Sequence, residues 1–166
     1  MAATFPATFP RRVAMPRIFV HAFSVPADAI DVANHVNNLA YLRWMQEVAI
    51  QHSAARGWPM ERYLALGQAW VVRSHFIEYL RPAFLGEALS LITYVCNLKR
   101  QSSLRRYLFY RPADRQVVAR AETDWVFVKL ADGRPIPIPE ELRGSFELIP
   151  DDEDVLATLG LRAAAS

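Results

Sequence analysis

The longest apolar segment of the chain carries only a few polar positions. Between residues 39 and 56, the polar residues Arg43, Gln46, Glu47 and Gln51 recur at helical spacings and form one narrow stripe, and apolar residues fill nearly all other positions. This pattern predicts a helix, and a helix that is apolar over most of its circumference is expected to be buried. Another part of the chain must therefore surround it.

Five other segments are predicted to be β-strands, because they are rich in β-branched and aromatic residues and end at polar turns or at proline. The connections between the last four are short, which predicts antiparallel pairing. The order is one strand, the long helix and four strands. It predicts an α+β fold in which a five-stranded antiparallel sheet wraps one long central helix. The predicted strands are residues 17–25, 69–80, 88–98, 104–111 and 117–130, with short helices at 60–66 and 140–146.

The 166 residues suit a single domain, given about 100–200 residues per domain. Residues 1–16 contain two Phe-Pro steps and no long apolar run, so they are interpreted as a flexible N-terminal tail. Residues 17–146 form the predicted domain. Residues 147–166 are interpreted as a C-terminal extension, in which a solvated acidic run at 151–154 leads into a small helix at 155–161.

Composition excludes several classes of protein. The net charge of +2 does not favour binding to nucleic acid. The single cysteine, Cys96, excludes an internal disulfide and a multi-cysteine metal site, and fits a reducing compartment. No segment is long and apolar enough for a signal or a membrane span, so we expect a cytoplasmic protein without a membrane partner. We also expect no bound metal.

A cluster of polar residues directly precedes the long helix. It contains an acid, an imidazole and three carboxamides within eight residues, namely Asp31, Asn34, His35, Asn37 and Asn38. Asn37 or Asn38 is the predicted N-cap, whose side-chain oxygen accepts a backbone N–H of the first turn. The cluster is therefore expected at the positive end of the helix, where unpaired N–H groups point outward.

This cluster carries a resemblance to a known family. The residues concerned are Asp31, His35, Val36, Asn37, Asn38, Tyr41 and Leu42. They resemble the signature of hotdog-fold acyl-CoA thioesterases of the 4-hydroxybenzoyl-CoA thioesterase-like family, in which an Asp precedes a Gly-His-Val-Asn-Asn-like turn into the central helix. Plant acyl-ACP thioesterases have a similar segment. Weaker matches follow in order at residues 79–82 with 86–87, at 102–103, and at 132–135 with 138–139.

The sequence departs from the family at one position, because Asn34 stands where a glycine usually precedes the histidine. Asn adopts the left-handed backbone at modest cost, so the turn is expected to survive.

The resemblance implies hydrolysis of an acyl-CoA thioester to free acid and CoA, with no cofactor other than the CoA of the substrate. Asp31 is the expected base or nucleophile, since one carboxylate serves in either role. The backbone N–H at the helix start, near Asn38 and Leu39, is the expected oxyanion donor. His35 is expected to assist by orienting the acid or by donating to the carbonyl.

Other positions are candidates for binding substrate. Asn37 and Tyr41 are expected beside the acyl group. The phosphates of CoA need basic or polar groups at a rim, and the turn between the third and fourth predicted strands supplies them. These candidates are Lys99, Arg100, Ser102 and Ser103, followed by Arg105 and Arg106.

Glu47 is interpreted either as a second catalytic base or as the i, i+4 ion-pair partner of Arg43. The ion pair is the favoured interpretation.

The resemblance also implies a homodimer or homotetramer with active sites between protomers. Three alternatives remain: an acyl-ACP thioesterase, a dehydratase on the same fold, and a non-catalytic acyl-CoA-binding protein. Turnover of thioesters separates the last of these from the enzymes.

Overall fold

The computed structural model describes residues 17–161. The predicted tail at 1–16 and the last five residues lie outside this range. Within it, the five predicted strands and the long helix are all present, in the predicted order. The strands are β1 (Ile18–Ser24), β2 (Gln68–Tyr79), β3 (Ala88–Leu98), β4 (Ser102–Arg111) and β5 (Gln116–Lys129). The helices are α1 (Asn38–Ala55), α2 (Met60–Ala65), α3 (Glu140–Gly144) and α4 (Asp152–Thr158), with a 3-10 turn, η1, at Ala27–Ala29.

The five strands form one antiparallel sheet in the order β1-β3-β4-β5-β2. The antiparallel pairing predicted from short connections is confirmed for β3 with β4 and for β4 with β5. It was wrong for β2 and β3, because β2 pairs with β5 at the edge of the sheet. The short connections join β3 to β4 and β4 to β5, whereas α1 and α2 lie between β1 and β2 in the sequence and carry the chain across to the other edge. Strands β1 and β2 are the two edges of the sheet.

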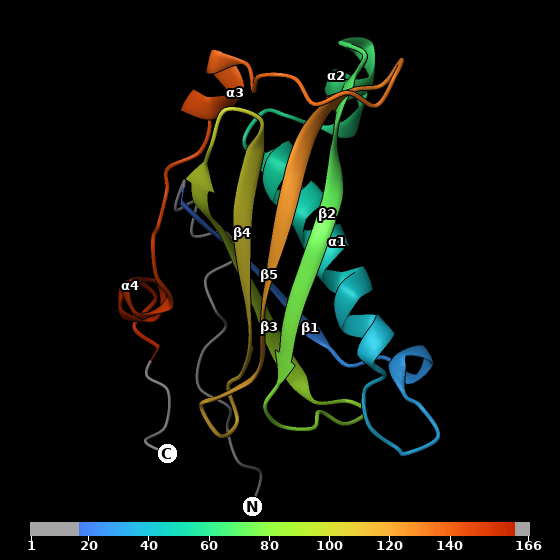
Figure 1. The fold of residues 1–166 in the computed structure, drawn as a ribbon. Coiled ribbons are helices and arrows are strands. Elements are labelled where there is room, and N and C mark those ends of the chain that lie inside the picture. Colours follow the sequence, from blue (N-terminus) through green and yellow to red (C-terminus); the bar gives the residue numbers. More distant parts are fainter. Residues whose placement is uncertain (1–16, 162–166) are drawn as a thin grey trace, which may run out of the picture.

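Helix α1 packs on one side of the sheet (Figure 1). Its buried residues include Tyr41, Trp44, Met45 and Val48, which join inward-facing residues of β3 and β4 in the main core. The sheet thus wraps the helix as predicted. The expectation that almost all apolar positions of the helix are buried was wrong at two positions: Leu39 is 69% exposed and Ile50 is 41% exposed, because the sheet of one chain covers only one side of the helix.

The C-terminal extension covers part of the opposite side of the sheet, where α4 lies (Figure 1). Ile149 and Val155 pack against outward-facing residues of β3 and β4, including Ile92 and Leu108. The predicted helix start at 155 was wrong: the acidic run is part of α4, and Asp151 caps it by accepting the N–H of Asp154. Acidic residues suit the first turn because the helix dipole is positive there.

Helices α2 and α3 lie at one end of the sheet, near the turn between β3 and β4, and the start of α1 lies toward the other end (Figure 1). A third cluster of buried residues closes the α2–α3 end and includes Trp58, Tyr63, Phe127 and Leu142. The polar cluster identified in the sequence therefore lies far from this apolar end.

Candidate active site

The polar residues before α1 form a tight loop, residues 31–38, called here the helix-start loop. Two hydrogen bonds close it: Asp31 N–H donates to the His35 carbonyl and Asn34 N–H donates to the Asp31 carbonyl, both at 3.0 Å. Asn34 has φ of +63°, so it adopts the left-handed conformation expected from the sequence. Asn replaces the usual glycine here without loss of the turn.

Asp31 is held by the loop but keeps access to its surroundings. Its Oδ1 accepts the N–H of Ala33 at 2.8 Å, and its side chain is 28% exposed. His35 Nδ1 lies 3.7 Å from the same oxygen, too far for a direct hydrogen bond and close enough for electrostatic contact. The sequence-predicted acid and imidazole are therefore brought together.

The start of α1 leaves one donor unused. Asn37 is the N-cap, and its Oδ1 accepts the N–H of Leu39 at 2.8 Å. The N–H of Asn38, the first residue of the helix, has no acceptor within residues 17–161. The expectation that the N–H groups of both Asn38 and Leu39 are available was thus wrong for Leu39. Asn38 remains the candidate oxyanion donor, through its backbone as predicted.

Contacts with the sheet and with η1 fix the helix-start loop in place. Val36 N–H donates to the Ala83 carbonyl at 2.9 Å, and Asn37 N–H donates to the Ala29 carbonyl at 2.8 Å. The Tyr79 hydroxyl, at the end of β2, donates to the Asn38 carbonyl at 3.2 Å. The loop is therefore attached to the β2 edge of the sheet.

Tyr41 lies in the core rather than on the surface. Its ring makes edge-on contacts with Trp44, Tyr79 and Phe109. Burial raises the pKa of its phenol to about 12. This placement favours a structural role, and contact of Tyr41 or Asn37 with substrate stays a prediction.

The structure does not bring the predicted CoA-binding turn near Asp31 within one chain. Tyr79, beside the helix start, pairs with Ala119 of β5, whereas Ser102 of the turn pairs with Val126 of the same strand. At about 3.3 Å per residue, the stretch of β5 between these two pairs is about 23 Å long. The turn and the helix-start loop therefore lie toward opposite ends of the sheet.

The residues of the turn differ in their surroundings. Lys99 and Arg100 are exposed, and Ser102 is half-buried. Ser103 is buried and donates its hydroxyl to the Asn97 carbonyl at 3.0 Å. The placement of Arg105 at a phosphate-binding rim was wrong: it is only 6% exposed. Alternation along β4 explains this, because Arg105 faces inward with Tyr107 and Phe109.

The predicted ion pair between Arg43 and Glu47 is not the one that forms. Arg43 instead lies 3.6 Å from the carboxylate of Asp28, which follows from η1 approaching the first turns of α1. Glu47 is exposed on the outer side of α1.

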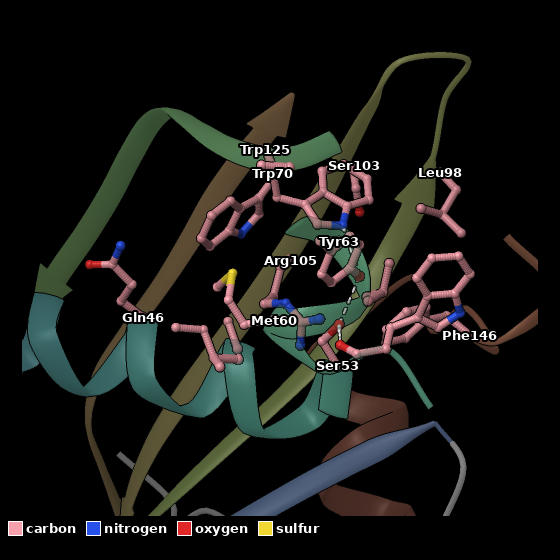
Figure 2. A pocket seen from close by; sticks show the side chains of 15 residues that line it. Gln46, Ser53, Met60, Tyr63, Trp70, Leu98, Ser103, Arg105, Trp125 and Phe146 are labelled. Atoms are coloured by element: carbon pink, nitrogen blue, oxygen red, sulfur yellow. Dashed lines mark hydrogen bonds between the residues drawn. The ribbon is translucent and has the colours of Figure 1, made fainter. Parts of the chain in front are cut away.

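A cavity of about 130 Å³ lies between the second half of α1, α2 and the sheet. We call it the aromatic cavity, since rings form much of its wall (Figure 2). The wall residues used below are Trp58, Tyr63, Trp70, Trp125 and Phe146. Polar groups from α1 and β4 complete it: Ser53, Ser103 and Arg105.

Sequence reasoning missed this cavity, because its residues come from β2, β3, β4, β5, α1, α2, the connection between α1 and α2, and the segment after α3. It also missed the buried pair formed by Arg105 Nη1 and His52 Nδ1, which are 2.8 Å apart. One signal was available: Arg105 shares its strand parity with Tyr107 and Phe109, and so belongs to the inward face.

Two further observations concern residues 17–161. In this part of the chain, no three His, Cys, Asp or Glu side chains are grouped so as to hold a metal ion. None of the helices described is both long and apolar enough to cross a membrane.

Known proteins resemble this chain in sequence and in fold. Over 121 residues it is 28% identical to the long-chain acyl-CoA thioesterase FadM of Escherichia coli, covering 71% of this chain and 89% of that protein. The 1,4-dihydroxy-2-naphthoyl-CoA thioesterase Slr0204 of Synechocystis superposes with a TM-score of 0.71 at 19% identity, covering 77% of this chain and 94% of its own. SAV2348 of Staphylococcus aureus, solved in complex with CoA, superposes with a TM-score of 0.73 at 13% identity. The superposition covers 90% of this chain and 89% of that chain.

These likenesses agree with the fold built from the residues: one antiparallel sheet around a long helix, the hotdog fold. The model of the thioesterase-like superfamily matches residues 25–146, which include the helix-start loop, α1 and four of the five strands. The chain belongs to the thioesterase-like superfamily.

Proposed function

We propose that this protein hydrolyses acyl-CoA thioesters at the helix-start loop, with Asp31 as base or nucleophile. The observation that carries the proposal is the pairing, on one rigid loop, of a partly exposed carboxylate and an unused N–H at a helix start. Membership of the thioesterase-like superfamily supports thioester hydrolysis. The relationship to FadM, a long-chain acyl-CoA thioesterase, supports CoA as the leaving group.

In the general-base route, Asp31 accepts a proton from water as the water oxygen attacks the thioester carbonyl carbon. Negative charge develops on the carbonyl oxygen, and the Asn38 N–H, at the positive end of α1, donates a hydrogen bond to it. The carbon–sulfur bond then breaks. The proton held by Asp31 passes to the CoA sulfur, which leaves as a thiol beside the free acid.

In the nucleophilic route, an Asp31 oxygen attacks the carbonyl carbon itself and expels the CoA thiolate, giving an acyl-aspartyl anhydride that water then hydrolyses. The two routes differ in the fate of solvent oxygen. In single turnover in H₂¹⁸O, attack of water on the Asp31 carbonyl of the anhydride places label in Asp31, which mass spectrometry of the peptide detects. The general-base route places label only in the released acid.

His35 assists in this proposal by its position 3.7 Å from Asp31. A neutral imidazole there orients the carboxylate or the attacking water, and a protonated one stabilises the carboxylate form. His35 is therefore a positioning residue.

A dimer completes the proposed site. The unpaired edge strand β2 exposes apolar residues, including Val71, Phe76 and Tyr79, and natural proteins cover or pair such edges. A two-fold axis that pairs β2 antiparallel with its copy places the Tyr79 end of one protomer beside the Gln68 end of the other. The basic turn at Lys99 and Arg100 of one chain then comes nearer the helix-start loop of its partner. In this arrangement, the basic turn would bind the phosphates of the CoA whose thioester lies at the partner's loop.

The test is release of thiol from a panel of acyl-CoAs that differ in chain length and ring content, with wild type and Asp31→Asn compared. The expected result is turnover by the wild type and loss of turnover in the variant. Tight binding of acyl-CoA with no thiol release would contradict hydrolysis and favour a non-catalytic binding protein.

An acyl-ACP thioesterase is the second candidate, because an acyl-ACP thioesterase from Bacteroides thetaiotaomicron shares the fold with a TM-score of 0.67 at 18% identity. Phosphopantetheine alone reaches the site in that case. Competition by free CoA against acyl-CoA turnover would separate the two, since it is expected only where the nucleotide is recognised.

A further inference from the structure

The aromatic cavity contains a cation that has no counter-charge among residues 17–161. Arg105 is 6% exposed, and its two hydrogen bonds both run from Nη1, to His52 Nδ1 at 2.8 Å and to Thr93 Oγ1 at 3.2 Å. No carboxylate of residues 17–161 lies within ion-pair distance of the guanidinium. Buried charges in proteins are normally paired, so this arrangement calls for an explanation.

Neither partner of Arg105 supplies the missing charge. A guanidinium only donates, so His52 must accept at Nδ1, which requires the neutral imidazole. Thr93 is uncharged, and its hydroxyl proton is donated to the Arg106 carbonyl. Burial lowers the pKa of Arg105 below its ordinary value, and an anion placed beside the guanidinium would oppose this effect.

Arg105 is one of the residues that line the cavity, and the hydrogen bonds of Nη1 leave Nε and Nη2 as further donors of its side chain. Figure 2 shows the side chain reaching between Met60, Tyr63 and Ser53, with the rings of Trp70 and Phe146 on either side. The guanidinium carbon lies 5.8 Å from the centre of the Phe146 ring. A ligand in the cavity would therefore meet apolar rings on its body and a cation at one end.

The size and opening of the cavity limit what enters. A cavity of about 150 Å³ holds a benzene molecule in other proteins, so about 130 Å³ accommodates one ring or a short branched chain. Ile50 and Met60, which both line the cavity, are 41% and 43% exposed, so the cavity opens outward between α1 and α2.

We propose that the aromatic cavity binds a small apolar carboxylate, with its oxygens on Arg105 and its hydrocarbon body, about one ring in size, against the aromatic walls. Guanidinium and carboxylate match in charge and in geometry, because two parallel N–H groups meet two oxygens. The carboxylate belongs either to a free acid or, if the proposed function holds, to the far end of an acyl group. The first source does not depend on the proposed function of the helix-start loop.

Tryptophan fluorescence reads occupancy directly, since Trp58, Trp70 and Trp125 line the cavity and only Trp44 lies elsewhere. Benzoate is the probe and benzamide its neutral isostere. The expected result is a saturable change with benzoate and at least about tenfold weaker binding of benzamide, which corresponds to about 1.4 kcal/mol. Equal binding of the two, or no binding of benzoate, would overturn the proposal.

Arg105→Met tests the role of the cation, and Arg106→Met is the matched control. Arg106 is the next residue on β4, points to the other face and pairs with Glu122 at 3.5 Å. We expect Arg105→Met to abolish the preference for benzoate over benzamide, and Arg106→Met to keep it. Retention of the preference in Arg105→Met contradicts the assignment of the anion to Arg105.

Ala69→Leu keeps the proposal testable if Arg105→Met does not fold. Ala69 lines the cavity from β2, so a larger side chain fills the space without touching the charge. Circular dichroism checks the fold of each variant. Loss of benzoate binding in folded Ala69→Leu is expected, and wild-type binding by this variant would show that benzoate does not occupy the cavity.

Thiol release separates the two sources. Hexadecanedioyl-CoA and palmitoyl-CoA differ by a terminal carboxylate, and their extended chains are comparable in length with the part of α1 that separates the helix-start loop from the cavity. We compare their KM values in wild type and Arg105→Met. A lower KM for hexadecanedioyl-CoA that disappears in the variant assigns the carboxylate to the acyl group, whereas equal KM values with benzoate binding intact assign it to a free acid. Absence of all thiol release would refute the proposed function, and the benzoate titration still decides the cavity proposal.

Discussion

The helix-start loop and the aromatic cavity lie at the two ends of the same helix and are built in opposite ways. The loop consists of consecutive residues held by short-range hydrogen bonds, and its carboxylate and helix N–H remain accessible. The cavity is assembled from six helices and strands and two connecting segments, and its cation is buried among rings. In the loop, the local backbone conformation positions the functional groups. In the cavity, the packing of side chains from distant segments positions them.

The two regions are therefore expected to respond differently to substitution. A side chain in the loop contributes little burial, so its replacement is expected to affect reaction more than stability. A group in or beside the cavity is desolvated, so its replacement is expected to affect stability or ligand preference first. Four substitutions test this contrast.

The largest effect is expected from Asp31→Asn. The amide cannot accept a proton from water or attack the thioester, so kcat/KM for acyl-CoA should fall about 10³-fold. The midpoint of thermal unfolding should change little, because the side chain is partly exposed and asparagine still accepts the Ala33 N–H. Thiol release and calorimetry measure the two quantities. Asp28→Asn, an exposed acid paired with Arg43, is the control and should retain activity.

The next largest effect is expected from His52→Ala, beside the cavity. It removes a hydrogen-bond partner of the buried Arg105 and the ring that stacks on Phe19. The free energy of unfolding should fall by about 3 kcal/mol, as measured by urea titration. Gln51→Ala alters the exposed neighbouring position and should be nearly neutral. If the free energy of unfolding falls no further in His52→Ala than in Gln51→Ala, the stability of the fold does not depend on the buried pair of Arg105 and His52.

A smaller effect is expected from Asn37→Ala at the helix start. Without the side-chain oxygen, the Leu39 N–H loses its acceptor, and the free energy of unfolding should fall by about 1 kcal/mol. Asn37→Asp keeps an acceptor and should stay close to wild type. If the free energy of unfolding falls equally in both variants, the contribution of Asn37 to stability does not come from its helix-capping hydrogen bond.

The smallest effect is expected at Asn34, the residue with φ of +63°. Asn34→Ala should lower the free energy of unfolding by under about 1 kcal/mol, because a Cβ without a polar group is disfavoured in this conformation. Asn34→Gly should be neutral or slightly stabilising. If the alanine and glycine variants have the same free energy of unfolding in urea titration, the loop does not require a left-handed backbone conformation at residue 34.

Most of the fold was predictable because its signals are local. The alternation of residues in the strands, the helical spacing of Arg43, Gln46 and Glu47 and the short turns each depend on neighbours in the sequence. The element boundaries agree with the structure to within two residues, apart from α4. There the acidic run was interpreted as loop, although acids favour the first turn of a helix.

The candidate site was predictable only in part. Asp31, His35 and the cap at Asn37 share one loop, so their closeness follows from the sequence. The separation of the basic turn from that loop depends on strand register, which places Ser102 opposite Val126. The prediction for Arg105 was wrong because basic residues near a turn are usually solvated. Side chains alternate between the two faces along β4, and this alternation places Arg105 on the inward face.

The antiparallel sheet around a helix and the polar loop that starts this helix could be predicted from the sequence, because periodicity and capping act between near neighbours. Three features follow instead from the packing of the folded chain: Arg105 meets His52, rings from distant segments enclose a cavity, and Leu39 and Ile50 remain exposed. These outcomes depend on which faces the sheet covers once it closes over the helix, and that is a property of the packed chain as a whole.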